Sequence, residues 1–241
     1  MRIFVDPAAL AAGEVVVGGD EHHYLAHVRR ARPGDPVELV DGGGHRAAAT
    51  IVRITEAATT LHAGTPERIA ARPPFVRALV PLIKGDRMEV CLEKLVEVGA
   101  DAIVVWPAAR SVARLDDARR DARLVRYQAI ARAAARQAGR AQVPEVRSAD
   151  GLAAALAGLP DGKRLVLDPA SDTALAAALE VAAGASAASD VTVISGPEGG
   201  LAPGELDQLA SFTPLGLGPR VLRAETAPLV AVALIRAATR S

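Results

Sequence analysis

Short apolar runs alternate with turn residues along the first part of the chain, up to about residue 62. The runs are RIFV, EVVV, PVELVD, AAATIVRI and TTLHAG, at residues 2–5, 14–17, 36–41, 47–54 and 59–64. Runs of this length, bounded by glycine, proline and aspartate, are typical of strands, and the GGGH after the third run predicts a hairpin turn. A helix is predicted from His22 to Arg32, with Asp20 as its cap and a Pro-Gly pair at its end. These elements predict a small β-rich domain.

A proline-containing segment at about residues 63–74 is predicted to be a linker, and the pattern changes after it. Strands are then predicted at residues 75–83, 102–107, 164–169, 191–195 and 213–218. Helices are predicted at residues 87–98, about 116–138, about 173–183, 203–211 and about 226–238. Strands that alternate with helices predict a parallel sheet covered on both faces. We therefore predict two domains, residues 1–72 and residues 73–241.

Charge is informative only locally. The chain of 241 residues has a formal net charge of zero, so its overall charge does not indicate an anionic partner. Residues 110–147, however, include ten arginines and four acidic residues, a local excess of six positive charges. This segment could bind phosphate groups, or it could be an ordinary solvated helix face in an arginine-rich protein.

The reactive side chains narrow the possible chemistry. The single cysteine, Cys91, excludes a disulfide framework and falls on the apolar face of the predicted helix 87–98, so we expect it in the core. All five histidines lie in the N-terminal block, which makes a Ser-His-Asp or Cys-His mechanism improbable. His23 and His27 could share a metal ion, but no third ligand is evident and no metal is expected. The absence of a signal peptide and of long apolar runs favours a cytoplasmic protein without a membrane partner.

Glycine and proline gather at the ends of three predicted strands near the C-terminus. The stretches are LVLDPAS, ISGPEGGL and LGLGPRVLRAETA, at residues 165–171, 194–201 and 215–227. They lack the lysine of a phosphate-binding P-loop and the spacing of a dinucleotide-binding GxGxxG motif. If the three strands are neighbours, loops at their carboxyl ends would form a ligand crevice; otherwise they are three unrelated tight turns.

These motifs resemble those of the ribosomal RNA small subunit methyltransferase E family of SPOUT methyltransferases. ISGPEGGL and LGPRVLRAETA are accompanied by KGDRMEVCLEKLVEVGAD upstream and by HHYLAHVRRARPGD near the start, so the resemblance covers nearly the whole chain. It implies a PUA-like β-barrel in residues 1–72 and, in residues 73–241, an α/β SPOUT domain with a C-terminal deep trefoil knot. It also implies a homodimer that binds S-adenosylmethionine. The implied reaction methylates N3 of a uridine, conventionally numbered 1498, in the decoding region of 16S rRNA within the 30S subunit.

The resemblance further implies which residues carry the function. The cofactor-binding residues would be Leu167, Asp168, Pro169, Gly196, Pro197, Glu198, Gly199, Gly200, Leu217, Gly218, Arg220, Val221, Leu222, Arg223, Thr226 and Ala227. Glu198 and Glu225 are candidate proton acceptors or cofactor anchors, and Arg223 is the candidate cation that stabilises a uridine anion. Glu198 could instead be structural, accepting N–H bonds across its own loop. The candidate RNA-binding residues are Arg29, Arg30, Arg32, Lys84, Arg87 and Arg110.

The chain departs from the usual family pattern at three positions. Ala224 stands where the family usually has threonine, which removes one possible hydrogen bond. Arg136 stands where a glutamate is usual, so any role of that carboxylate is in doubt. Ala202 replaces a serine that would cap the next helix, although Pro203 still suits a first helical turn.

Two other functions stay open at this point. One is a SPOUT methyltransferase that acts on a different RNA, because the sequence does not show the target base. The other is an RNA-binding assembly factor without catalytic activity, which the intact glycine loops disfavour.

Overall fold

The protein forms two compact units, which we describe separately. A computed structural model describes residues 1–70, 73–111, 120–174, 177 and 190–239. The first unit comprises Met1–Ala71 and Ala135–Val143, and the second comprises Arg72–Ala134 and Pro144–Ser241. The segment 135–143 therefore packs with the N-terminal residues, and within it Gln142 forms isolated β-bridges with Gly42 and Gly43. The helix predicted at about residues 173–183 falls largely outside the described residues.

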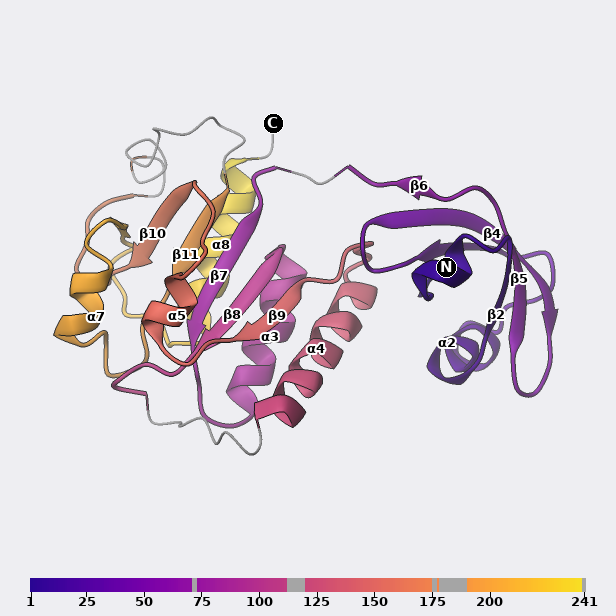
Figure 1. Cartoon of the computed structure of the whole chain (residues 1–241), viewed down its shortest axis with the longest axis horizontal. Coiled ribbons are helices and arrows are strands. Elements are labelled where there is room, and N and C mark those ends of the chain that lie inside the picture. The colour runs from indigo at the N-terminus through magenta and orange to yellow at the C-terminus, as the bar shows by residue number, and fades with distance from the viewer. Residues whose placement is uncertain (71–72, 112–119, 175–176, 178–189, 240–241) are drawn as a thin grey trace. The chain divides into compact units, whose positions relative to one another are not determined.

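A six-stranded sheet forms the first unit (Figure 1). Its strands are β1 (Arg2–Phe4), β2 (Glu14–Val17), β3 (Pro36–Val40), β4 (His45–Ile54), β5 (Thr59–Ala63) and β6 (Glu67–Arg68). The order is β1-β3-β4-β5-β2, with β6 also paired to β4, and only the β1–β3 pair is parallel. Burial alternates along β2 and β4, so one face of the sheet covers a core that includes Ile3, Leu39, Ile51 and Leu61. The strands predicted from the apolar runs are confirmed.

The helix predicted from His22 to Arg32 is wrong in its bounds and in its type. The chain forms a short α2 (Gly19–His23) and continues as a π-helix, η1 (Tyr24–Val28). Gly18 is the N-cap, so Asp20 lies in the first turn. The helix ends early because Arg30 adopts a left-handed conformation with φ of 52°. A further short helix, α1 (Pro7–Leu10), and strand β6 were not predicted.

A parallel sheet forms the second unit, as the sequence predicts, but it has six strands and not the five that were predicted. Its strands are β7 (Val76–Pro81), β8 (Ala102–Trp106), β9 (Glu145–Ser148), β10 (Lys163–Leu167), β11 (Val191–Ile194) and β12 (Thr213–Leu215). The order is β12-β10-β11-β7-β8-β9, and every pair is parallel. All residues of β8 and β11 are buried, as expected for strands covered on both faces.

Helices cover both faces of this sheet (Figure 1). They are α3 (Asp86–Val98), α4 (Arg120–Gln137), α5 (Leu152–Leu156), α7 (Pro203–Gln208) and α8 (Thr226–Ala238). On one face α3 packs against α8, and α4 lies beside α3, joined to it by the Arg126–Glu89 ion pair. On the other face, residues of α5 and the segment from α7 to Phe212 share a core with Leu79, Trp106 and Ile194. None of the helices within the described ranges has the length and hydrophobicity that crossing a bilayer requires.

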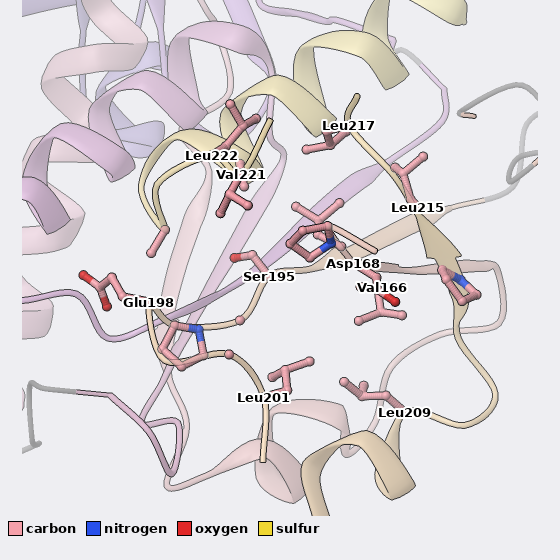
Figure 2. Close-up of a pocket in the computed structure, with 18 of the residues that line it drawn as sticks. Val166, Asp168, Ser195, Glu198, Leu201, Leu209, Leu215, Leu217, Val221 and Leu222 are labelled. Carbon is pink, nitrogen blue, oxygen red and sulfur yellow. The ribbon is translucent and has the colours of Figure 1, made fainter. Parts of the chain in front are cut away.

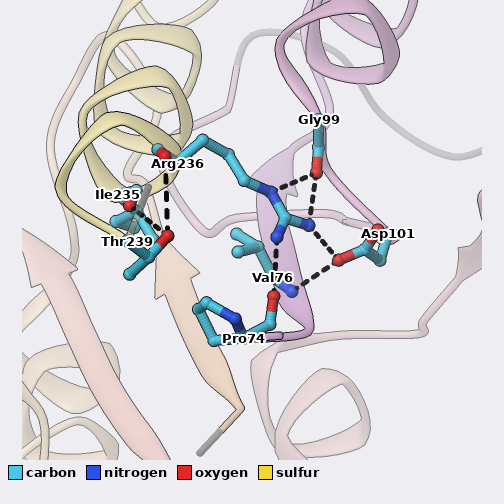
Figure 3. Close-up of polar contacts among 7 residues, drawn as sticks. All are labelled: Pro74, Val76, Gly99, Asp101, Ile235, Arg236 and Thr239. Atoms are coloured by element: carbon cyan, nitrogen blue, oxygen red, sulfur yellow. Dashed lines mark hydrogen bonds and ion pairs between the residues drawn. The ribbon is translucent and has the colours of Figure 1, made fainter. Parts of the chain in front are cut away.

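Arg236, near the end of α8, joins the amino ends of β7 and β8 (Figure 3). Its Nε and Nη2 donate to Gly99 O at 2.8 and 2.7 Å, and its Nη1 donates to Pro74 O at 2.7 Å. Nη2 also forms an ion pair with Asp101, whose Oδ2 accepts the Val76 N–H at 2.8 Å. One guanidinium thus fixes the last turn of α8 to the start of the sheet.

Candidate functional site

Three loops converge at the carboxyl end of the parallel sheet. They follow β10, β11 and β12, which are adjacent strands in the order β12-β10-β11. The ladders pair Leu167 with Leu215 and Val166 with Ile194, so the three strands end at the same level. The crevice predicted from three strand-end loops on neighbouring strands is therefore confirmed.

The loops enclose a cavity of about 790 Å³. Figure 2 shows Val166, Leu201, Leu209 and Leu215 on one side of it and Val221 and Leu222 on the other. Polar side chains among its lining residues include Asp168, Ser195, Glu198, Arg220 and Arg223. Apolar walls with a few polar groups, in a volume of this size, are typical of sites for small organic ligands.

Most of the predicted cofactor-binding residues line this cavity. The lining includes Leu167, Asp168, Pro169, Gly196, Pro197, Glu198, Gly200, Leu217, Gly218, Arg220, Val221, Leu222, Arg223 and Ala227. The two predicted residues outside the lining are Gly199 and Thr226. Gly199 lies against Arg110, where a Cβ would be 3.1 Å from the Arg110 Cβ, and Thr226 is the first residue of α8.

Ten residues of the cavity wall are not among the predicted cofactor-binding residues, although five of them lie within the three predicted loop stretches. The ten are Val166, Ser195, Leu201, Leu206, Leu209, Ala210, Phe212, Pro214, Leu215 and Ala224. Leu206, Leu209 and Ala210 have the spacing of one helix face directly after the GPEGG loop, and this pattern could have indicated them. Ser195 and Ala224 carry no such signal, because their exposure to the cavity depends on how the loops fold.

Close backbone contacts hold the loops together. A Cβ on Gly216 would lie 1.9 Å from Ser171 O, so only glycine fits where the loop after β12 meets the loop after β10. The Gly216 N–H donates to Thr173 O at 3.0 Å across the same junction. Asp168 orders the loop after β10, because its Oδ1 accepts the Ala170 N–H at 2.9 Å.

A cluster of four charged side chains lies beside the cavity. Arg87 Nη1, on α3, is 3.1 Å from Glu198 Oε1 and 3.5 Å from Glu225 Oε2. Arg223 Nη1 is 3.9 Å from Glu225 Oε1. The Glu225 side chain is only 12% exposed, whereas that of Arg223 is 76% exposed. One arginine of α3 therefore connects the GPEGG loop with the loop that precedes α8.

This cluster bears on the two interpretations of Glu198. Within the part of the chain that the structure describes, no N–H of its own loop donates to the Glu198 carboxylate. The loop is instead closed by the Gly200 N–H, which donates to Pro197 O at 2.9 Å. Glu198 is 35% exposed and lines the cavity, with Arg87 as its charged partner. These contacts disfavour a structural role in which Glu198 accepts N–H bonds across its own loop.

Cys91 lies in the core beneath the charged cluster and is not a nucleophile. Its side chain is fully buried within α3. Burial raises the pKa of the Cys91 thiol to about 12, and the nearby negative charge of Glu225 acts in the same direction. The thiol is therefore protonated near neutral pH, as expected for a core cysteine.

Glu205 anchors α7, which forms part of the cavity wall. Its buried carboxylate accepts the Ala109 N–H and the Ala202 N–H, each at 2.8 Å. Ala202 is the N-cap of α7 and has no side-chain acceptor, but Glu205 satisfies its backbone N–H from the third helical position. Glu205 therefore supplies its own half of a capping box, whereas the half that a serine hydroxyl would provide is absent.

The other two departures from the family pattern also have structural partners. Arg136 forms an ion pair with Glu21 of α2, within the first unit. Ala224 is buried and lines the cavity, so its methyl group adds to the apolar wall.

The six candidate RNA-binding residues differ in their surroundings. Four of them are exposed: Arg29, Arg30 and Arg32 in the first unit and Lys84 in the second. Arg110 is also exposed, but its Nη1 donates to Gly199 O and Leu201 O, both at 3.3 Å. Arg87 belongs to the charged cluster described above. Among the described residues, no group of three or more His, Cys, Asp or Glu side chains could hold a metal ion.

Comparison with known proteins relates the whole chain to RNA-modifying enzymes. Residues 72–236 match the family described as an RNA methyltransferase domain, and residues 17–57 match an RNA methyltransferase PUA domain. The chain is 36% identical to a ribosomal RNA small subunit methyltransferase E of Mycobacterium bovis, over 98% of this chain and 90% of that protein. It is 30% identical to its Bacillus subtilis counterpart, over 91% of this chain and 88% of that protein.

Solved structures of similar fold contain a bound methyl donor. The small subunit methyltransferase E of Neisseria gonorrhoeae, bound to S-adenosyl methionine, has a TM-score of 0.80 and 27% identity. That comparison covers 98% of this chain and 97% of the other. A putative methyltransferase of Legionella pneumophila in complex with the same cofactor has a TM-score of 0.82 and 25% identity, with the same coverage.

Proposed function

This chain belongs to the ribosomal RNA small subunit methyltransferase E family, and from this premise we propose that it methylates 16S rRNA with S-adenosylmethionine as methyl donor. The proposed target is N3 of a uridine in the decoding region, modified within the assembled 30S subunit. The observation that carries the proposal is the cavity formed by the three strand-end loops, in a chain whose structural relatives bind this cofactor. Acting on ribosomal RNA would place the protein in the cytoplasm.

The residues of the cavity suit S-adenosylmethionine. Leu217, Val221 and Leu222 offer apolar side chains that would flank an adenine ring, and their backbone groups would meet its polar edge. Ala227, in the first turn of the 13-residue helix α8, borders the same cavity, so its methyl group would contact the ligand, while the Thr226 and Ala227 N–H groups donate to Arg223 O at 2.9 and 3.0 Å. Glu198 would compensate positive charge on the ligand. We also propose that these loops form the trefoil knot typical of the family and that the active protein is a homodimer.

The chain would contribute positioning and charge to the reaction. When bound, S-adenosylmethionine supplies an electrophilic methyl group. The uridine N3 must lose its proton, and Glu198 is the better placed acceptor because it lines the cavity and is more exposed than Glu225. Arg223, which is largely exposed beside the cavity, would stabilise the negative charge that develops on the uridine.

RNA binding would use both proposed domains, residues 1–72 and residues 73–241. The exposed Arg29, Arg30 and Arg32 would contact phosphates from the first, with Lys84 and Arg110 from the second. The target base would have to leave its stack to reach the cavity. We expect binding to ribosomal subunits to weaken steeply with salt, and a flat salt response in a filter-binding assay would contradict the phosphate contacts.

Mass spectrometry of 16S rRNA from a deletion strain tests the proposed reaction. The strain should lack one N3-methyluridine, and purified protein with S-adenosylmethionine should restore it on isolated 30S subunits. A methyl group on another RNA or base would support a different SPOUT target. Calorimetry without cofactor binding, together with an unaltered rRNA, would instead support the assembly factor.

Glu198→Gln tests the role of the carboxylate. The substitution should lower the methylation rate by at least about a hundredfold, because an amide cannot accept the proton. Glu93→Gln is the matched control, since Glu93 is a half-exposed residue of α3 that pairs with Lys94 and does not line the cavity. If Glu198→Gln leaves both turnover and cofactor affinity unchanged, the proposed role of Glu198 is wrong.

A further inference from the structure

Ser195 presents a buried hydroxyl to the cavity. It follows β11 directly, and its N–H donates to Leu79 O at 3.1 Å, which fixes its backbone to the neighbouring strand β7. The residue is 2% exposed and lines the cavity. Within the described part of the protein, the Ser195 Oγ has no hydrogen-bond partner. A polar atom therefore faces a ligand site without a bond from the chain.

Two buried threonine hydroxyl groups on the strands are bonded, whereas Ser111 and Ser148, like Ser195, have a buried Oγ without a partner among the described residues. Thr59 Oγ1 is 2.9 Å from Nδ1 of the buried His22, and Thr192 Oγ1, on β11 itself, accepts a long bond from Arg77 at 3.5 Å. Burial of a hydroxyl without a partner costs free energy, and of these three serines Ser195 is the one that lines the cavity. Figure 2 shows the Ser195 side chain between Asp168 and Glu198, in the middle of the residues that line the cavity.

We propose that the Ser195 hydroxyl is a binding residue for the nucleoside ligand of this cavity, an inference that rests on the proposed function. Its partner would be a polar group of the sugar or of the amino-acid half of the ligand. The apolar side chains of Leu217, Val221 and Leu222 suit the base, whereas Ser195 is one of the polar residues of the lining, as are Asp168 and Glu198. Binding of the ligand supplies the hydrogen bond that the chain leaves unmade.

Ser195→Ala tests this inference through the melting temperature, which should not fall, and the affinity for the ligand, which should fall. Without ligand, the melting temperature should stay equal or rise by on the order of 2 °C, because an unbonded buried hydroxyl has been removed. With S-adenosylhomocysteine as the probe, calorimetry should show roughly fivefold to tenfold weaker binding, because one hydrogen bond is lost. A purely structural role for Ser195 would not produce this combination.

Ser148→Ala is the matched control. Ser148 ends strand β9, and its Oγ is likewise buried without a partner among the described residues, but it does not line the cavity. The control should have an unliganded melting temperature equal to or above that of the unaltered chain, and its affinity for S-adenosylhomocysteine should not change. Weaker binding by Ser148→Ala to the same degree would overturn the inference, because the effect would then not come from the cavity.

A second probe locates the partner of the hydroxyl. 5′-Methylthioadenosine lacks the amino-acid half, so an affinity loss seen only with S-adenosylhomocysteine assigns Ser195 to that half, and an equal loss with both probes assigns it to the sugar. Equal affinity of Ser195→Ala and the unaltered chain for both probes overturns the inference alone. If the unaltered chain binds neither probe, the proposed function fails, and the inference fails with it.

Discussion

The two ends of the parallel sheet hold their charged side chains in different ways. At the amino end, the Arg236 guanidinium makes three bonds to backbone carbonyls and an ion pair with Asp101, and its side chain is only 14% exposed. At the carboxyl end, Arg87 meets Glu198 and Glu225 at 3.1 and 3.5 Å in half-buried surroundings. The amino end is bonded within the chain, whereas the carboxyl end keeps polar groups available to a ligand.

The parallel sheet accounts for this division. Loops at the carboxyl ends of adjacent strands converge, so a ligand site can form there without interrupting the strands. Residues at the amino ends of β7 and β8 can then be used for stability alone. We therefore expect the loss of a charged side chain to lower the free energy of unfolding more at the amino end of the sheet than at the carboxyl end.

Arg236→Met should produce the largest loss of stability. The substitution leaves Asp101 mostly buried without its charged partner and leaves Gly99 O and Pro74 O without their donor (Figure 3). Removing one member of a buried, hydrogen-bonded ion pair costs about 3 kcal/mol or more. Urea unfolding measures the free energy directly.

Arg126→Met is the control for this measurement. Arg126 is an exposed arginine on α4, paired with Glu89 in the same unit, so its loss should cost less than about 1 kcal/mol. If the two substitutions cost the same, the amino end of the sheet is not the anchor that the contacts indicate.

Glu205→Ala, at the carboxyl end of the sheet, should produce the next largest loss of stability. The substitution leaves the Ala109 and Ala202 N–H groups without their acceptor, at a cost of about 2 kcal/mol in the free energy of unfolding. Glu205→Gln keeps one amide oxygen and should cost less. An equal cost for both variants would mean that only one of the two N–H bonds matters.

Much of the fold was predictable from the sequence because its signals are local. Apolar runs bounded by turn residues marked the strands, and the bounds of α8, Thr226–Ala238, agree with the predicted helix. The strand β9 and the helix α5 were missed because EVRS and LAAAL are too short to show a period. The π-helical turn before Arg29 was missed because its widening depends on packing, with Leu25 held in the core.

The candidate site was predictable in its loops but not in its contacts. The glycine-rich motifs identified three loops, and the parallel sheet brings them together. The sequence analysis places Arg87 among the candidate RNA-binding residues. Its contact with Glu198 depends on where α3 packs relative to loops more than a hundred residues away in sequence, which no local pattern encodes.

Arg87→Met should cost only about 1 kcal/mol of stability, in contrast to Arg236→Met. Arg87 and Glu198 are both partly exposed, so water can replace much of what each loses, and the mostly buried Glu225 keeps Arg223 at 3.9 Å. Arg87→Lys, which keeps the charge, should recover part of this loss. A cost as large as that of Arg236→Met would show that the carboxyl end is as tightly bonded as the amino end.

The smallest predicted effect is a change in the free energy of unfolding that comes from the Cys91 thiol and is visible only at alkaline pH. The pKa of its thiol is raised in the folded protein from about 9 to about 12, chiefly by burial and further by Glu225. The unfolded chain therefore loses the thiol proton at lower pH than the folded chain, so the stabilising contribution is complete below pH 9 and is lost as the pH rises toward 12. Between pH 8 and pH 9.5 the unaltered protein should lose under about 1 kcal/mol more stability than Cys91→Ala, in which this group is absent. Because every other titrating group is common to both chains, the difference between their urea unfolding curves isolates the thiol, and parallel losses in the two chains would place Cys91 in contact with water.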